Sequence, residues 1–328
     1  MKSIDYANIF KVSLGCSIAF VLAETFGFQY ATSIVTITLL SILKTRKETF
    51  LVAWKRILAF LSAALIGTTV FHLLNYSLIS LTVYLLIYHL ICQIGNFMEG
   101  FSMSTVLMLH IWKGGAVSLP LLMNEFGLML IGISMGIIMN LYMPSRIGRI
   151  RKMQREIELE MSQILFEMSR AVFQENADEN IKQRLDDLEK LIHEALFHSQ
   201  YTEKNFLFRD MSYYVSYTKM RMDQVQLLKR IYQNLPRLQE SYMQTNLVSK
   251  FMRITAISMD EYNNASDLLQ YLSKLRKQFR KAPLPTSRQE FESRAVLYEI
   301  VNELQELLIL KQNFSSNLTA YQIETFWQ

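Results

Sequence analysis

Residues 130–152 read Leu130-Ile-Gly-Ile-Ser-Met-Gly-Ile-Ile-Met-Asn-Leu-Tyr-Met-Pro-Ser-Arg-Ile-Gly-Arg-Ile-Arg-Lys152, and this stretch divides the chain into two parts. Before it, charged residues are scarce and apolar segments follow one another closely. After Pro144, charges of both signs recur every few residues. The apolar run stops at Met143-Pro144 and is followed by five basic residues, Arg146, Arg149, Arg151, Lys152 and Arg155. Basic residues within about 15–20 positions of a membrane end favour the cytoplasmic side, which predicts a membrane domain followed by a cytoplasmic tail.

The composition of the whole chain averages these two parts. Of the 328 residues, 51% are hydrophobic and 19% are charged. Residues 1–143 hold eight Lys and Arg against five Asp and Glu, and residues 144–328 hold 26 against 24. The excess of basic residues is therefore spread over both parts, whereas a nucleic-acid-binding protein concentrates it on one domain. We expect a lipid bilayer, and no nucleic acid, among its partners.

Six apolar segments precede Pro144. They are Val12–Phe28, Tyr30–Leu43, Ile57–Leu74, Leu78–Ile94, Phe101–Trp112 and Phe126–Met143. A helix that spans the bilayer needs about 20 apolar residues, with a range of roughly 17–25. The second and fifth segments are short, so they either extend into flanking residues or are re-entrant. The sequence predicts an all-α protein, with a transmembrane domain of about six helices at residues 1–145 and a cytoplasmic helical bundle at 146–328.

Charge supports a topology with both termini in the cytoplasm. The predicted loop Lys44–Arg56 carries five basic residues, and the tail after Pro144 begins with five more. Two basic clusters separated by four crossings agree with six crossings in total. Asn75–Ser77 then forms an external turn, and Lys113 lies at the external interface.

Small residues recur every four positions in two segments. Ala59, Ala63 and Gly67 line one helix face, and Gly132 and Gly136 line another. Such faces let helix backbones approach closely in a membrane. We favour this packing role over a substrate path.

The second part is helical by its pattern. Apolar residues lie at helical spacing, as in Leu185, Leu188, Ile192 and Leu196. Breaks are predicted at Asn176–Asn180, near Pro236, at Asn263-Asn264 and at Pro283–Pro285, the last joining an antiparallel pair. Ser287-Arg-Gln-Glu290 is a capping box, which predicts a long helix from about Arg288. We expect five or six amphipathic helices.

Enzyme signatures are missing from the sequence. It contains no Walker loop, GxSxG, HExxH or CxxC motif, which predicts neither an enzyme nor a cofactor and no intrinsic ATP drive. Two pairs, Glu189/His193 and Glu194/His198, have the spacing for a metal. Hydrogen-bonded pairs on a helix surface explain them better.

Titratable residues within the apolar segments are the candidates for a transport path. Glu24 lies inside the first segment, and a carboxylate near hydrocarbon is costly unless it is paired, hydrated or protonated. It serves either a proton relay or only the external interface, next to a turn at residues 27–30. The later segments contain three histidines, His72, His89 and His110, whereas Glu99 and Glu125 lie near segment ends. A cluster of Glu24 with one histidine would form a proton-coupling site. Trp54 and Trp112 fit an aromatic belt or, alternatively, stack an aromatic substrate.

The chain resembles a known family in both parts. Leu130–Ile133 with Asn140–Pro144 is similar to the closing "IGI…NlymP" signature of the bacterial aromatic acid exporter family member 1 proteins, relatives of fusaric-acid-resistance-type transporters. Ser41–Arg46, and Arg56 before a helix of small residues, are similar as well. Residues 146–328 resemble the exporter C-terminal domain of that family. The chain departs from the pattern where Ala59 and Ala63 replace glycines.

The resemblance implies a multi-pass protein of the bacterial cell membrane that exports aromatic or other small organic acids, and the missing ATPase motif suggests proton coupling. On this hypothesis Glu24 carries protons, while Arg56 and Lys113 attract the organic anion at opposite faces. Larger relatives carry two six-helix halves, so we expect a homo-oligomer, with a dimer favoured. The alternative is a membrane-anchored scaffold or sensor whose helical tail binds a cytoplasmic protein partner.

Overall fold

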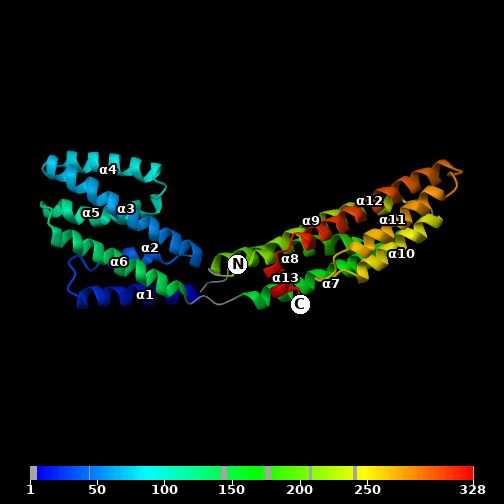
Figure 1. Ribbon diagram of the computed structural model, residues 1–328, viewed down its shortest axis with the longest axis horizontal. Helices are drawn as coiled ribbons and strands as arrows, with labels where there is room; N and C mark the ends of the chain where they lie inside the picture. The colour runs from blue at the N-terminus through cyan, green and yellow to red at the C-terminus, as the bar shows by residue number, and fades with distance from the viewer. Residues whose placement is uncertain are drawn as a thin grey trace. The chain divides into compact units, whose positions relative to one another are not determined.

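The computed structural model describes residues 6–43, 45–141, 146–173, 179–206, 209–238 and 242–327. These residues form helices and turns without a β-strand (Figure 1). The chain divides into two compact units, Met1–Pro144 with Lys204–Leu207, and Ser145–Glu203 with Phe208–Gln328. The predicted all-α class is confirmed for the described residues, whereas the predicted break at Met143-Pro144 lies outside them.

The first unit, here called the membrane unit, contains six described α-helices. They are α1 (Tyr6–Thr25), α2 (Ser33–Ser41), α3 (Arg46–Leu73), α4 (Leu78–Ile94), α5 (Phe101–Gly114), preceded by a 3-10 turn at Met98–Gly100, and α6 (Leu119–Leu141). Only α1, α3 and α6 among the described helices are long and apolar enough to cross a membrane, and α4 is a shorter apolar helix. The nine residues of α2 extend about 13 Å, less than half of a hydrocarbon core of about 30 Å. Six full crossings therefore stay a prediction.

Hydrogen bonds show which ends of these helices meet. Lys11 in α1 donates to Asn140 Oδ1 at 2.5 Å, and Arg46 at the start of α3 donates to the Asn140 carbonyl at 3.4 Å. At the opposite end of α6, the backbone N–H of Gln29 donates to Asn124 Oδ1 at 2.8 Å, and Asn124 Nδ2 donates to the Gln29 carbonyl at 3.0 Å. The segment from Gln29 to Arg46 therefore runs from one end of the membrane unit to the other, with α2 at its centre.

The predicted loop Lys44–Arg56 was wrong, because its residues from Arg46 onward form the first turns of α3. Thr45 is the N-cap of this helix, and its hydroxyl accepts from the Glu48 N–H at 3.3 Å. A threonine followed three residues later by glutamate is a helix-start signal, and it outweighs the polar composition that suggested a loop.

Small residues serve as close-packing positions. A Cβ at Gly136 would lie 2.5 Å from Ser41 Cβ, and one at Gly132 would lie 2.4 Å from Ile37 Cγ2. These two glycines therefore admit α2 against α6. Ala59 in α3 similarly faces Gly100, where an added Cβ would come within 2.3 Å. The contacts support the packing role proposed from the sequence.

The second unit, here called the C-terminal unit, is a helical bundle. Its described helices are α7 (Ile147–Ala171), α8 (Glu179–Asn205), α9 (Ser212–Asn234), α10 (Met243–Ile257), α11 (Ser266–Lys281), α12 (Arg288–Ser316) and the short α13 (Ala320–Phe326). A continuous apolar core joins α7 to α12. The breaks near Pro236, at Asn263-Asn264 and at Pro283–Pro285 are confirmed, and α11 and α12 run side by side after the last one (Figure 1). The predicted break at Asn176–Asn180 lies largely outside the described residues.

The start of α12 at Arg288 is also confirmed. Ser287 accepts from the Glu290 N–H at 3.1 Å. The expected return contact is different, because the Glu290 carboxylate accepts from the N–H and hydroxyl of Thr286, at 2.8 and 2.9 Å, and not from Ser287.

The Ser287→Ala variant should be less stable because one N–H at the start of α12 loses its acceptor. We expect a loss of about 1 kcal/mol in the unfolding free energy of the C-terminal unit, measured by denaturant titration of the full chain in detergent. The exposed neighbour Gln289→Ala is the control. An unchanged midpoint for Ser287→Ala would show that this cap contributes nothing.

Candidate functional site

A buried acid and a histidine meet inside the membrane unit. Glu125, in the second turn of α6, is completely buried, and its Oε2 lies 2.8 Å from Nδ1 of His110 near the end of α5. The His110 side chain is 15% exposed. We call His110 and Glu125 the acid–histidine pair.

The other faces of the His110 ring are also in contact with the protein. Its Nε2 lies 3.1 Å from the hydroxyl of Ser33, the first residue of α2. Tyr30 stacks on the ring with 4.1 Å between centroids and 11° between planes. The backbone of Tyr30 has φ +59°, a left-handed conformation that is uncommon for a residue other than glycine. Such strained positions cluster at functional sites when the surroundings hold them.

Glu125 has a second partner, which connects it to the link between α1 and α2. Asn124 Nδ2 donates to Glu125 Oε1 at 3.2 Å, and the same amide is bonded to Gln29. Beside a neutral imidazole the ionised carboxylate leaves one net negative charge in the interior, and beside an imidazolium it leaves none. Because an uncompensated buried charge is expensive, the arrangement is suited to taking up and releasing one proton.

Arg56 forms a second polar centre. It is 5% exposed, and its guanidinium donates to Ser41 Oγ at 2.6 Å, to the Leu40 carbonyl at 2.8 Å and to the Glu99 carbonyl at 3.3 Å. All three acceptors are neutral, since the Glu99 carboxylate instead binds Lys55 at 2.7 Å. A guanidinium has five N–H donors. Arg56 therefore closes the C-terminal end of α2 and has donors to spare.

Helix α2 touches both centres. Its first residue, Ser33, contacts His110, and its last residue, Ser41, contacts Arg56. Between them Thr38 is fully buried, and its hydroxyl has no hydrogen-bond partner among the described residues. A shift of α2 would alter both polar centres together.

The remaining candidates from the sequence lie apart from these centres. Glu24, in the last turn of α1, is exposed and forms no hydrogen bond or ion pair with its side chain among the described residues. His72 and Lys113 are exposed as well. His89 is half-buried, with its ring edge-on to Phe101 at 5.0 Å between centroids. The acid that pairs with a histidine is thus Glu125, which the sequence placed only near a segment end.

The two tryptophans of this unit lie where an aromatic belt would place them. Trp54 is exposed. Trp112 is partly buried, and its indole N–H donates to the carbonyl of Ser77, in the turn between α3 and α4, at 3.2 Å. The indole of Trp112 therefore anchors the end of α5 to that turn.

Comparison with known proteins covers nearly the whole chain. Residues 5–143 match "Aromatic acid exporter family member 1" and residues 148–312 match "Putative aromatic acid exporter C-terminal domain". The chain is 28% identical over 314 residues to the "Uncharacterized protein YqjA" of Bacillus subtilis (strain 168), covering 96% of this chain and 97% of that protein. A crystal structure of a membrane protein from Clostridium difficile 630 is 22% identical, with a TM-score of 0.47, over 52% of this chain and 99% of the other. The chain therefore belongs to the aromatic acid exporter family, member 1.

Proposed function

We propose that this protein exports small organic acids, aromatic carboxylates among them, across the bacterial cell membrane in exchange for protons. Membership of the exporter family supports transport. The observation that carries the proton step is the completely buried Glu125 hydrogen-bonded to His110 within the membrane unit.

The acid–histidine pair is the proposed proton carrier. Ionisable residues inside a membrane domain are rare and mark ion and proton pathways. The pair changes its net charge by one when it gains or loses a proton, and its hydrogen bonds reach α2 through Ser33 and the α1–α2 link through Asn124. The loading of the pair can therefore influence the position of α2.

Arg56 is the proposed contact for the carboxylate of the exported acid. A guanidinium binds a carboxylate through two parallel N–H donors, and the described acceptors of Arg56 are all neutral. Three further cations, Lys11, Arg46 and Lys55, occur on α1 and on the first turns of α3, which favours an anion at that end. Lys113, exposed at the end of α5, would attract the anion at the opposite end.

Uptake by vesicles tests the proposal. Purified protein is reconstituted, the lumen is made acidic, and labelled 4-hydroxybenzoate is added outside. Proton exchange drives the acid into the acidic lumen, whereas passive permeation distributes a weak acid toward the alkaline side. Accumulation above that of protein-free vesicles supports exchange. Its absence for this and other aromatic and aliphatic acids would contradict the proposal and favour the membrane-anchored scaffold or sensor.

Arg56→Lys is expected to raise the half-saturating acid concentration by about tenfold or more, because an ammonium cannot reproduce the planar, two-donor contact with a carboxylate. The measurement is initial uptake against 4-hydroxybenzoate concentration. The control is Lys113→Arg, a change at an exposed cation in the same unit. An unchanged half-saturation in Arg56→Lys would remove Arg56 from the binding site.

One observation favours a second candidate function, acyl transfer. Ser33, His110 and Glu125 form hydrogen bonds in the order of a hydrolase triad. However, the backbone N–H groups of Ser33, Ile34 and Val35 are bonded to the carbonyls of residues 30–32, at 2.9, 3.1 and 3.3 Å, so these donors do not form an oxyanion hole. Transport is the better-supported function, and covalent labelling of Ser33 by a fluorophosphonate would reverse this order.

A further inference from the structure

The C-terminal unit contains a lysine enclosed by aromatic rings. Lys311, in α12, is 4% exposed. Its ammonium nitrogen lies 5.6, 5.5 and 5.7 Å from the ring centroids of Tyr217, Phe314 and Trp327. It donates to the backbone carbonyl of Glu261 at 2.7 Å. Since an ammonium has three N–H donors, this single peptide acceptor satisfies only part of its hydrogen-bonding capacity.

The charged groups around Lys311 come from three other elements. Arg221 on α9 is 1% exposed, and it donates to the Glu158 carboxylate of α7 at 2.7 Å. Asp260 and Glu261 follow α10, and the Glu261 carboxylate accepts from Tyr213 at 2.7 Å. Burial and the charge of Arg221 lower the pKa of Lys311 to about 7, against the opposing effect of Glu158, Asp260 and Glu261.

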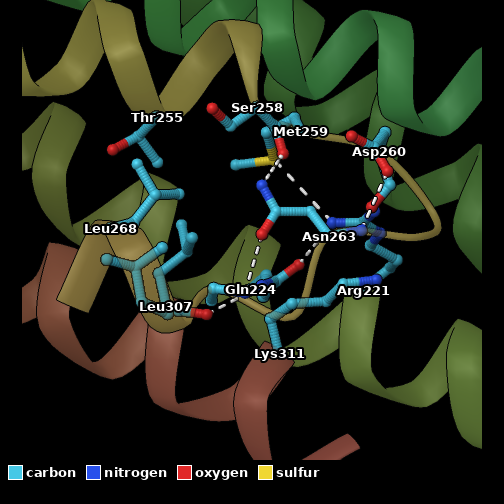
Figure 2. Close-up of a pocket in the computed structure, with 12 residues that line it drawn as sticks. Arg221, Gln224, Thr255, Ser258, Met259, Asp260, Asn263, Leu268, Leu307 and Lys311 are labelled. Atoms are coloured by element: carbon cyan, nitrogen blue, oxygen red, sulfur yellow. Dashed lines mark hydrogen bonds between the residues drawn. The ribbon is translucent and has the colours of Figure 1, made fainter. Parts of the chain in front are cut away.

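Residues 258–265, the link between α10 and α11, are held in place by the same two cations. Lys311 binds the Glu261 carbonyl, and Arg221 binds the Asp260 carbonyl at 3.3 Å and Met259 Sδ at 3.7 Å. Beside the link is a cavity of about 20 Å³, above the 10–15 Å³ or so that one water requires. Figure 2 shows the side chains of Asn263, Gln224 and Arg221 converging on it.

The end of the chain covers the lysine from another side. Trp327 contributes one ring of the enclosure. The preceding Phe326 stacks on Tyr213 at 4.7 Å between centroids, and Tyr213 is the residue that binds Glu261. The link and the C-terminal residues thus share contacts around Lys311.

We propose that Lys311 is a proton-operated switch: neutral, it keeps the 258–265 link closed over the aromatic enclosure, and protonated, it opens the link so that water reaches the ammonium. An enclosed ammonium with unsatisfied donors is expensive in a low-dielectric interior, and opening the link is the smallest movement that hydrates it. The proposal does not depend on the transport activity. A unit that opens on acidification could, however, sense the protons that an exchanger admits.

The direction of the pH effect follows from linkage. Because the pKa of Lys311 lies below its ordinary value of 10.5, the unfolded chain binds more protons than the folded chain between about pH 7 and pH 10.5. The stability that Lys311 permits therefore rises with pH through this window, and its destabilising effect is fully present below about pH 7.

Hydrogen exchange of the full-length protein in detergent tests the switch. Protection of residues 258–265 is compared at about pH 6 and about pH 8, after correction for intrinsic exchange rates. One pH unit across the midpoint changes the ratio of charged to neutral lysine about tenfold, so we expect protection at the lower pH to fall at least threefold or so. Lys311→Met should keep the link protected at both pH values, and the exposed Lys219→Met should behave as the wild type.

Two outcomes would overturn the switch. One is equal protection of the wild-type link at both pH values, and the other is a pH dependence that survives in Lys311→Met. If that variant does not fold, Lys311→Leu replaces it, and the wild-type profile between about pH 5 and pH 9 also decides. A midpoint near 7 supports the proposal, whereas a midpoint below about pH 6 assigns the transition to carboxylates or histidine.

Discussion

Replacing Glu125 by glutamine is expected to abolish the accumulation of 4-hydroxybenzoate in vesicles with an acidic lumen. Glutamine has nearly the shape of glutamate and can keep its contacts with His110 and Asn124, but it cannot exchange a proton. The variant should therefore still fold and still exchange labelled for unlabelled acid across the membrane without a pH gradient. Loss of coupled uptake with retained exchange would separate the proton step from acid binding.

The matched control for Glu125→Gln is Glu24→Gln, the same chemical change at an exposed position of the same unit. We expect the control to accumulate acid at close to the wild-type rate. His110→Gln should lower coupled uptake as well, because it removes the titratable partner of Glu125. The opposite pattern, with Glu24→Gln inactive and Glu125→Gln active, would return the proton-carrying role to Glu24.

Breaking the buried ion pair of the C-terminal unit should cause the largest loss of stability. Glu158→Ala leaves the guanidinium of Arg221 in the interior without its carboxylate, and Tyr217 also loses an acceptor. Removing one member of a buried pair costs about 3–5 kcal/mol. The measurement is denaturant unfolding of the full chain, followed by the fluorescence of Trp327 with Trp54 and Trp112 replaced by phenylalanine.

The exposed pair Arg288–Glu292, at 2.8 Å on α12, is the control for this measurement. Glu292→Ala should change the unfolding free energy by about 0.5 kcal/mol or less. The double variant Glu158→Ala/Arg221→Met should recover part of the loss, because no unpaired charge then remains buried. A loss below about 1 kcal/mol in Glu158→Ala would mean that water or another group compensates Arg221.

Local sequence signals predicted the helices well. The apolar segment Leu78–Ile94 became α4 with the same bounds, and Ser287 set the start of α12. Hydropathy and capping depend on neighbouring residues, so they can be read directly. The signal missed was Thr45 with Glu48, a capping pattern that starts α3 within a basic segment assigned to a loop.

The polar centres required contacts between distant segments. Glu125 and His110 were each noted, but their pairing depends on how α5 and α6 pack, which no local pattern records. Arg56 was expected near an anion, yet its contacts with Ser41 and Leu40 depend on the short α2. Lys311 did leave a signal: it continues the apolar face formed by Leu304 and Leu308, and a lysine in such a position predicts a buried amine.

The most direct test of the account measures protons and acid together in the same vesicles. A pH-sensitive dye in an acidic lumen reports proton release when 4-hydroxybenzoate is added outside, while label uptake reports the acid. The account predicts that wild-type protein releases protons in proportion to acid uptake and that Glu125→Gln does not. Proton release by Glu125→Gln in the wild-type proportion would contradict the assignment of the proton step to the acid–histidine pair.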